Sequence, residues 1–356
     1  MNNIFEFAPK ELVLDAFLCW CFNFDKSENI LEKEFSHNLV KEIYALCGGK
    51  KKLNIKAINP LRQQTESKID VVIDITLHND EKLTFIFENK LETSYHSDQL
   101  EKHVNNATRE FNGEKKYIYF KIGHMYQEDL MLPEDVRDQY TTIDRMCILN
   151  IFKVNQLDND IFKSYYKFLL KIEESYKVEK ELLQKGRQLK QSELETLFCS
   201  PSGQYMILDE LNQKLGGKIK LSRGTSFGRP WSNLSLISIK EKHSVFWRID
   251  WRKNNKDYKP YICLRKYKTT METTKEDDDF LQGMRMSFEK ITKEYSSLEF
   301  SNIHNLGSKE REIGILFFDN EKNTIPNVIN ELASFTRSFI IEINKEEQFY
   351  EKIPEL

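Results

Sequence analysis

Apolar residues recur every three or four positions over the first 46 residues and then alternate with polar ones in several stretches that follow. Helical spacing predicts amphipathic helices, and alternation predicts strands with one buried face. Gly48-Gly49 ends the second helix, and Asn59-Pro60 is expected to stop the first strand. The N-terminal elements are two helices, three strands, a helix and a strand, over residues 9–24, 28–46, 53–58, 69–77, 82–90, 94–106 and 115–122.

The second half of the chain changes character twice. Residues 154–198 hold many Glu and Lys side chains at solvent spacing, one glycine and no proline, which predicts a charged helical connector. After Pro201 the pattern is typical of an α+β unit. Its elements are a helix, three strands, a helix, a strand and a closing helix, over residues 204–215, 232–240, 244–252, 261–267, 278–294, 312–319 and from 326. We therefore expect an α/β protein in three parts, residues 1–153, 154–200 and 201–356.

Composition narrows the class of protein. The 356 residues are 40% hydrophobic and 31% charged, which is too apolar for a disordered chain. The formal net charge is −3, so a nucleic acid would have to meet a local basic patch. The six cysteines form no C-x-x-C pair, and Asp15 inside the first apolar run argues against a signal peptide. With no apolar run of ~20 residues, we expect a cytoplasmic protein without a membrane span.

The hairpin formed by the second and third predicted strands carries charged residues where a core strand rarely has them. Because side chains alternate along a strand, Asp70 and Asp74 share one face of the first strand, and Glu88 and Lys90 share one face of the second. If Asp70 lies opposite Glu88, the strands close on the loop of residues 78–80, a common hairpin length. If Asp74 took that place, the strands could not close at this turn. We predict that Asp70 is the partner of Glu88 and that Asp74, roughly 13 Å along the strand at ~3.3 Å per residue, is a bystander.

Two facing carboxylates repel each other unless one is protonated or a cation lies between them. A hard divalent ion with oxygen ligands, Mg²⁺ or Mn²⁺, is the simplest occupant. Lys90, beside Glu88, could then act on an attacking water or stabilise negative charge on a phosphate. The alternative is an ordinary salt-bridged hairpin edge.

Asp70, followed by Glu88-Asn89-Lys90, resembles the D…(D/E)-x-K signature of the PD-(D/E)XK nuclease superfamily, and more closely its bacterial branch with I-D…E-N-K…Q-L spacing. Ile69 replaces the proline that often precedes the Asp. The resemblance covers the first half of the chain, and the order α-β-β-β-α-β is the core of that restriction-endonuclease-like fold, a mixed sheet flanked by helices. It implies a Mg²⁺-dependent (or Mn²⁺-dependent) phosphodiester hydrolase. Asp70, Glu88 and the main-chain carbonyl of Asn89 would bind the metal, and Lys90 would work with the water nucleophile.

The resemblance extends to two neighbouring helices. Gln99 matches the Gln of a Q-x-x-x-Y element and is implied as a catalytic residue, whereas His103 stands where that element has Tyr. Glu11 matches an acidic residue that related enzymes place near the metal, and Asp15, one turn later, could substitute for it. For His103 and for His96, a surface position without a role is the favoured interpretation.

The C-terminal part has no recognised motif, and we expect a recognition or regulatory domain. It interleaves aromatic and cationic side chains, as surfaces that stack bases and bind phosphates do. These residues are Arg229, Trp231, Trp247, Arg248, Trp251 and Arg252. The same alternation is typical of a half-buried strand, with core on one face and salt bridges on the other, and this interpretation is favoured.

Together these features predict a nuclease with an appended domain and DNA as the favoured substrate. Analogy with bacterial enzymes of this kind suggests restriction or anti-phage defence, in a homodimer or as a subunit of an effector complex. Two alternatives stay open: a catalytically silent module that binds nucleic acid or protein, and a nuclease directed at RNA or tRNA. The intact set of Asp70, Glu88 and Lys90 argues against the silent module, because buried charges are costly to keep without a use.

Overall fold

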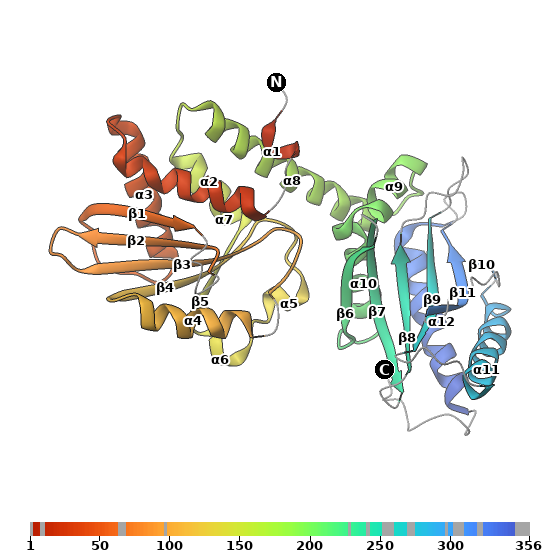
Figure 1. Ribbon diagram of the computed structural model, residues 1–356. Helices are drawn as coiled ribbons and strands as arrows, with labels where there is room; N and C mark the ends of the chain where they lie inside the picture. The colour runs from red at the N-terminus through yellow and green to blue at the C-terminus, as the bar shows by residue number, and fades with distance from the viewer. Residues whose placement is uncertain are drawn as a thin grey trace. The chain divides into compact units, whose positions relative to one another are not determined.

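The structure, a computed structural model, describes residues 3–7, 11–62, 69–95, 98–226, 229–239, 243–250, 260–268, 275–295, 298–301, 310–318 and 323–345. The chain is an α/β protein with an N-terminal mixed five-stranded sheet, a helical middle and a C-terminal antiparallel six-stranded sheet (Figure 1). Its contacts divide it into two compact units, Met1–Ser175 and Tyr176–Leu356. The α/β class is thus confirmed, and the three-part division at residues 153 and 200 stays a prediction.

The N-terminal sheet has the order β1-β2-β3-β4-β5, in which β1, β2 and β3 are antiparallel and β3, β4 and β5 are parallel. Helices α2, α3 and α7 cover one face, and α4 and α6 cover the other (Figure 1). The elements are α1 (Ile4–Phe7), α2 (Glu11–Asn23), η1 (Phe24–Lys26), α3 (Ile30–Leu46), β1 (Ile55–Arg62), β2 (Val71–Leu77), β3 (Lys82–Lys90), α4 (Gln99–Glu110), β4 (Glu114–Lys121), α5 (Gln127–Leu130), α6 (Glu134–Arg137), β5 (Tyr140–Asp144) and α7 (Arg145–Val154).

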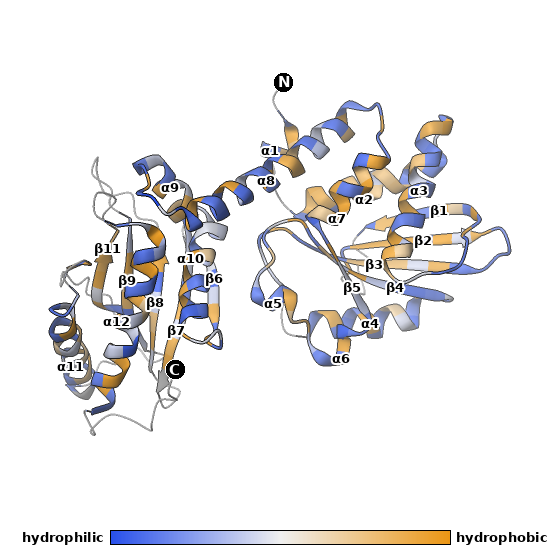
Figure 2. Ribbon diagram, turned by 180° about the vertical axis from the view of Figure 1, so that it is seen from behind, coloured by the Kyte–Doolittle hydropathy of each residue, from blue (hydrophilic) through white to orange (hydrophobic). Residues whose placement is uncertain are grey.

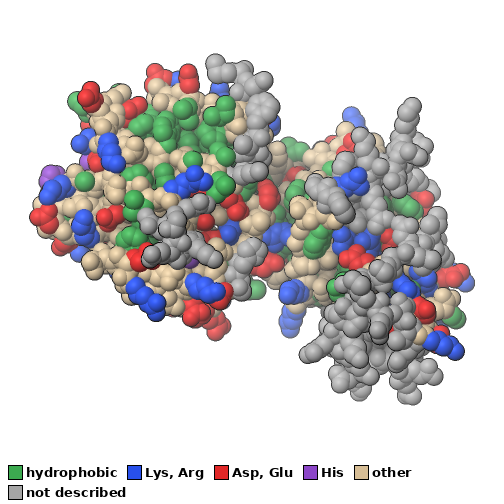
Figure 3. Space-filling model, viewed as in Figure 1, with side chains coloured by type: hydrophobic (Ala, Val, Ile, Leu, Met, Phe, Trp, Pro, Cys, Tyr) green, Lys and Arg blue, Asp and Glu red, His purple; other side chains and the backbone are tan. Residues whose placement is uncertain are grey.

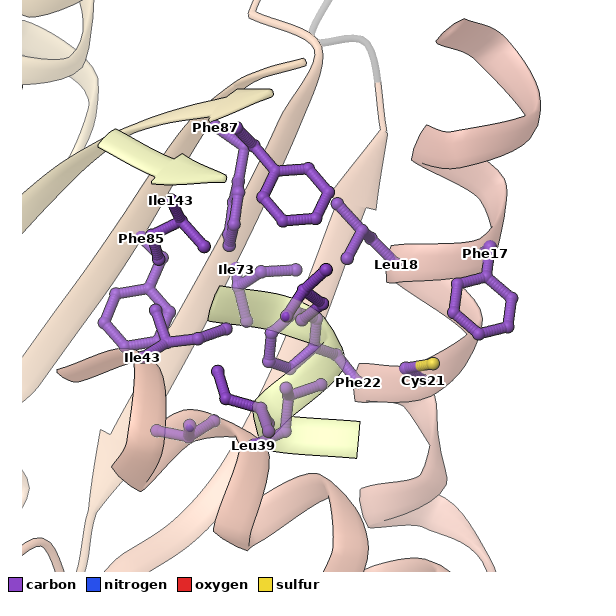
Figure 4. Packing of buried hydrophobic residues seen from close by; sticks show 14 of the residues in the cluster. Phe17, Leu18, Cys21, Phe22, Leu39, Ile43, Ile73, Phe85, Phe87 and Ile143 are labelled. Atoms are coloured by element: carbon purple, nitrogen blue, oxygen red, sulfur yellow. The ribbon is translucent and has the colours of Figure 1, made fainter. Parts of the chain in front are cut away.

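Strand β3 is buried from its second residue to its last because helices cover both of its faces. Phe85 and Phe87 point toward α2 and α3, where they pack with Ile73, Leu18 and Ile43 (Figure 4). Figure 2 shows the hydrophobic colour concentrated in these strands and the helices against them, and the hydrophilic colour on the β2–β3 turn. Each fully buried Phe, Leu or Ile contributes about 1.5–3 kcal/mol, so this core holds β3 firmly between the helices.

The predicted hairpin register is confirmed. Val71 pairs with Phe87 and Thr76 with Lys82, which places Asp70 opposite Glu88 at the open end of the hairpin. The parallel pairing of β3 with β4 requires a crossover, and α4 makes it. The ends of these two strands therefore lie side by side.

One strand boundary was predicted wrongly. β1 continues through Asn59 and Pro60 to Arg62, whereas the sequence indicated a stop at Asn59-Pro60. β1 is an edge strand, and a proline on the outer side of an edge strand removes no hydrogen bond from the sheet. The helix expected from residue 94 also begins later, at Gln99.

The helical middle is interrupted, where the sequence predicted a long helical stretch. α8 (Asp160–Gln184) and α9 (Gln191–Cys199) are separated by residues 185–190, which include Gly186. Another break, residues 155–159, separates α7 from α8. The elements between residues 123 and 153 had no counterpart in the sequence prediction.

The C-terminal unit is an antiparallel sheet, β10-β11-β9-β8-β7-β6, with α10 and α12 against one face (Figure 2). Ser200 caps α10 by accepting a hydrogen bond from the Gly203 N–H at 2.8 Å, and Pro201 occupies its first turn. β6 and β10 were not predicted. The elements are α10 (Pro201–Lys214), β6 (Leu221–Ser226), β7 (Arg229–Ile239), β8 (His243–Asp250), β9 (Tyr261–Lys268), α11 (Lys275–Thr292), β10 (Glu299–Ser301), β11 (Glu310–Phe317) and α12 (Ile325–Lys345).

For β8, the expected core on one face and ion pair on the other are found, but the strand is buried on both faces and not half-buried, since Phe246 and Arg248 are buried as well as Trp247. Trp247 is fully buried and its indole N–H donates to Thr336 Oγ1 at 2.9 Å. Arg248, on the opposite face, lies 4.8 Å from the Trp231 ring and pairs with Glu310. The Arg229 side chain is exposed, and Trp251 and Arg252 lie outside the described residues. In the described part of the chain, no helix combines the length and apolar character needed to cross a bilayer.

Candidate metal centre

Glu88 lies at the centre of the candidate site and is fully buried. It projects from β3 toward α4, where Lys90 Nζ lies 2.5 Å from one carboxylate oxygen and His103 Nδ1 lies 3.1 Å from the other. Neither contact has the angles of a hydrogen bond, so both oxygens keep lone pairs free for a further ligand. A buried carboxylate without hydrogen bonds is costly, and the charge of Lys90 offsets only part of that cost.

Asp70 completes a carboxylate pair with Glu88. It precedes the first residue of β2, and its Oδ2 accepts a hydrogen bond from the main-chain N–H of Asn89 at 2.9 Å. Burial, and then the Glu88 carboxylate, raise the pKa of Asp70 to about 7. Without a cation, the Asp70 carboxyl is therefore partly protonated at neutral pH.

Helix α2 supplies two more carboxylates. Asp15 is buried, and its Oδ1 accepts a hydrogen bond from the Asn89 side-chain amide at 2.6 Å. Burial is the main cause that raises the Asp15 pKa, opposed by that hydrogen bond and by Arg62. Glu11 Oε1 accepts from the Leu91 N–H at 3.2 Å and from the Thr93 hydroxyl at 2.7 Å. Both acids therefore hold the end of β3 rather than pointing away from it.

Lys90 is cationic at neutral pH. Burial by itself would lower the pKa of its ammonium, but the carboxylates of Glu88, Glu11 and Asp70 outweigh burial, and the net pKa is raised. A lysine in this state donates hydrogen bonds and positive charge, and it does not accept a proton. Its role in the site is therefore electrostatic.

Most residues predicted for the site gather at one end of the hairpin. Asp70, Glu88, Asn89, Lys90 and Glu11 are brought together, as the hydrogen bonds and charge interactions above describe. Gln99 is the half-buried first residue of α4, and its catalytic role stays a prediction.

The surface interpretation of His103 was wrong. Its ring is 2% exposed and contacts Glu88, because α4 turns Leu100, His103 and Ala107 toward the sheet. That three-and-four spacing is a signal the sequence contains: His103 lies inside an apolar stripe. His96 lies outside the described residues.

The donor set implied by the resemblance consists of oxygen atoms, the ligands that a hard divalent ion takes. Within the described ranges, no group of three or more His, Cys, Asp and Glu side chains could hold a metal ion. The set implied by the resemblance is different, since it uses two side-chain carboxylates and the main-chain carbonyl of Asn89. Two observations favour a cation there: the contacts of the Glu88 oxygens with Lys90 and His103 lack the angles of hydrogen bonds, and the pKa of Asp70 is raised.

Charges on the surface are mixed. Figure 3 shows Lys and Arg side chains interspersed with Asp and Glu over the coloured part of the visible face. This agrees with a formal net charge of −3. The coloured part of this face therefore presents no broad positive field to a polyanion.

The chain matches no family model, no curated protein and no solved structure. The fold and the geometry of the site are therefore the evidence for the class of protein.

Proposed function

We propose that the N-terminal unit is a metal-dependent nuclease of the PD-(D/E)XK kind that hydrolyses phosphodiester bonds, with DNA as the favoured substrate. The observation that carries this proposal is the buried end of β3, where Glu88 and Lys90 lie side by side with Asp70 opposite in register. The mixed sheet with its α4 crossover supports the finer fold assignment. The C-terminal unit would serve recognition or regulation.

Each residue has a defined part in this proposal. Asp70, Glu88 and the Asn89 carbonyl would hold Mg²⁺ or Mn²⁺, which supplies Lewis acidity toward the phosphate and lowers the pKa of water. Asn89 is fixed from two sides, by Asp70 at its N–H and by Asp15 at its amide. The Lys90 ammonium would donate hydrogen bonds to the phosphate oxygens or the nucleophile and so stabilise the negative charge that develops on them.

The proposal is tested by cleavage of supercoiled plasmid and of a structured RNA in Mg²⁺, Mn²⁺ or EDTA. Glu88→Gln and Lys90→Met remove one charge each, and we expect each to lower the rate by about 10²–10³-fold. Asp74→Asn is the matched control, because it also removes one charge from the hairpin, but Asp74 lies opposite Thr84 on β3 and pairs with Lys82 at 3.9 Å. Cleavage of the RNA but not of the plasmid would mean that the substrate is RNA and not DNA.

Metal binding is measured separately by calorimetry with Mn²⁺. Binding that Glu88→Gln abolishes, without cleavage, would favour the silent binding module. A wild-type protein that neither binds Mn²⁺ nor cleaves either nucleic acid would refute the metal site and leave a salt-bridged hairpin.

A further inference from the structure

Lys121 is a second lysine beside the candidate site. It ends β4, is fully buried, and is the register partner of Lys90 in the parallel ladder. Its ammonium donates a hydrogen bond to the main-chain carbonyl of Thr93 and lies 3.2 Å from Asp129 Oδ2. It also lies 4.9 Å from the centre of the Tyr126 ring. No step proposed above uses this charge.

The segment that leaves β3 is held from several sides. The Ile122 N–H donates to the Lys90 carbonyl at 3.1 Å. Gly123 approaches Leu91 so closely that a Cβ on Gly123 would lie 1.8 Å from the Leu91 carbonyl oxygen. Thr93 contacts Lys121 through its carbonyl and Glu11 through its hydroxyl. The position of Thr93 therefore links Lys121 to an acid of the candidate site.

Asp129 is the fixed end of this linkage. Its Oδ1 accepts from the Tyr119 hydroxyl at 2.5 Å, and its Oδ2 accepts from the Tyr126 N–H at 3.0 Å. The Tyr126 hydroxyl in turn donates to Glu92 at 3.3 Å. Asp129 thus ties α5 to β4 and presents an anchored carboxylate to Lys121.

We propose that Lys121 and Asp129 form a buried positioning pair, which holds the chain after Lys90 and so places Glu11 and the end of β3. The inference rests on the proposed function, because it concerns the geometry of the same metal site. A buried ion pair can often be replaced by neutral side chains without loss of stability. In this proposal the pair fixes the position of the neighbouring chain and adds little to stability. Its removal should therefore weaken metal binding without lowering the stability of the protein.

The test uses full-length Lys121→Met/Asp129→Asn, which removes both charges and keeps side chains of similar size. We expect an unchanged unfolding midpoint, together with Mn²⁺ affinity and kcat lowered by about 10-fold while KM for DNA stays the same. Lys121→Arg, which keeps the charge, should retain most of the Mn²⁺ affinity. Lys121→Met alone leaves Asp129 unpaired and should unfold more easily than the double variant.

A readout independent of nuclease activity keeps the two proposals apart. Hydrogen exchange in residues 91–95 should accelerate in the double variant, with β3 and β4 protected as in wild type. This outcome would support the positioning pair even if wild type proved inactive. Unchanged exchange in residues 91–95, or loss of protection throughout β4, would overturn it. Unchanged Mn²⁺ affinity in an active double variant would overturn it as well.

Discussion

Removing the charge of Asp70 should stabilise the protein when no metal is bound. Its carboxylate faces Glu88 across the hairpin, in a buried position where both acids cannot ionise cheaply. Asp70→Asn keeps a side-chain oxygen that can accept the Asn89 N–H hydrogen bond and removes only the repulsion. The variant should therefore lose metal binding and gain stability, a combination expected of a ligand site and not of a structural salt bridge.

The magnitude follows from the difference between the folded and unfolded pKa of Asp70. The folded value is about 7, raised by burial and by Glu88. The unfolded value is ~3.9, so between these two pH values the folded state binds more protons than the unfolded state. The unfolding free energy therefore falls as pH rises through this window. The full loss is about 4 kcal/mol, of which about 3 kcal/mol falls between about pH 5 and pH 8.

The assay is native-state hydrogen exchange of the β3 amides, corrected for intrinsic rates, in EDTA from about pH 5 to pH 8. These amides report on the N-terminal unit irrespective of how the C-terminal unit unfolds. The stability difference between Asp70→Asn and wild type should grow by about 3 kcal/mol across this range. Mg²⁺ at about 100 times its Kd should restore about 2.7 kcal/mol to wild type and nothing to the variant.

Asp74→Asn should follow wild type at every pH, because Asp74 does not face Glu88. If the unfolding free energies of wild type and Asp70→Asn change in parallel across the pH range, the raised pKa of Asp70 is refuted. Parallel curves would mean that Asp70 has an ordinary pKa and that no cation is needed beside Glu88.

Three further substitutions test contacts of the N-terminal unit, and for each the free energy of unfolding is measured in urea. Gly123→Ala should destabilise by more than about 2 kcal/mol, since the added methyl would overlap the Leu91 carbonyl; a neutral effect would show that this close approach is not required. Arg145→Met should cost about 3–5 kcal/mol, because Glu173 Oε2 accepts hydrogen bonds from Arg145 Nε at 3.0 Å and Nη2 at 2.8 Å and would lose both; a loss within experimental error would contradict this. Pro60→Thr should stay within about 0.5 kcal/mol of wild type, and a large loss would argue against an edge position.

The hairpin could be predicted from sequence because two local constraints agree there. Alternation assigns each residue to a face, and the turn at residues 78–80 allows one register, so the pairing of Asp70 with Glu88 follows without tertiary information. The end of β1 could not be predicted in the same way. Whether Pro60 stops a strand depends on whether that strand lies at an edge, and the order of strands in a sheet is a tertiary property.

The environment of Glu88 was only partly predictable. His103 lies within an apolar stripe of α4, but its contact with Glu88 exists only because α4 crosses over β3 and β4. Lys121 ends β4, which the sequence predicts as the strand of residues 115–122, but its partner Asp129 lies on α5, which had no counterpart in the sequence prediction. Local patterns thus located the charged end of β3, whereas its contacts with α2 and α4 depend on how these helices pack on the sheet.

A charge balance connects these observations. Four carboxylates and two cationic side chains interact at the site, namely Glu11, Asp15, Asp70, Glu88, Arg62 and Lys90. With His103 counted as neutral, full ionisation leaves two uncompensated negative charges, which is the charge of one Mg²⁺ or Mn²⁺. The Lys121–Asp129 pair is neutral in itself, so it can hold the neighbouring chain without changing this balance. A site that full ionisation would leave two positive charges short, and whose Asp70 has a pKa of about 7 as a result of burial and Glu88, is one that a divalent cation would stabilise and a monovalent cation would satisfy only in part.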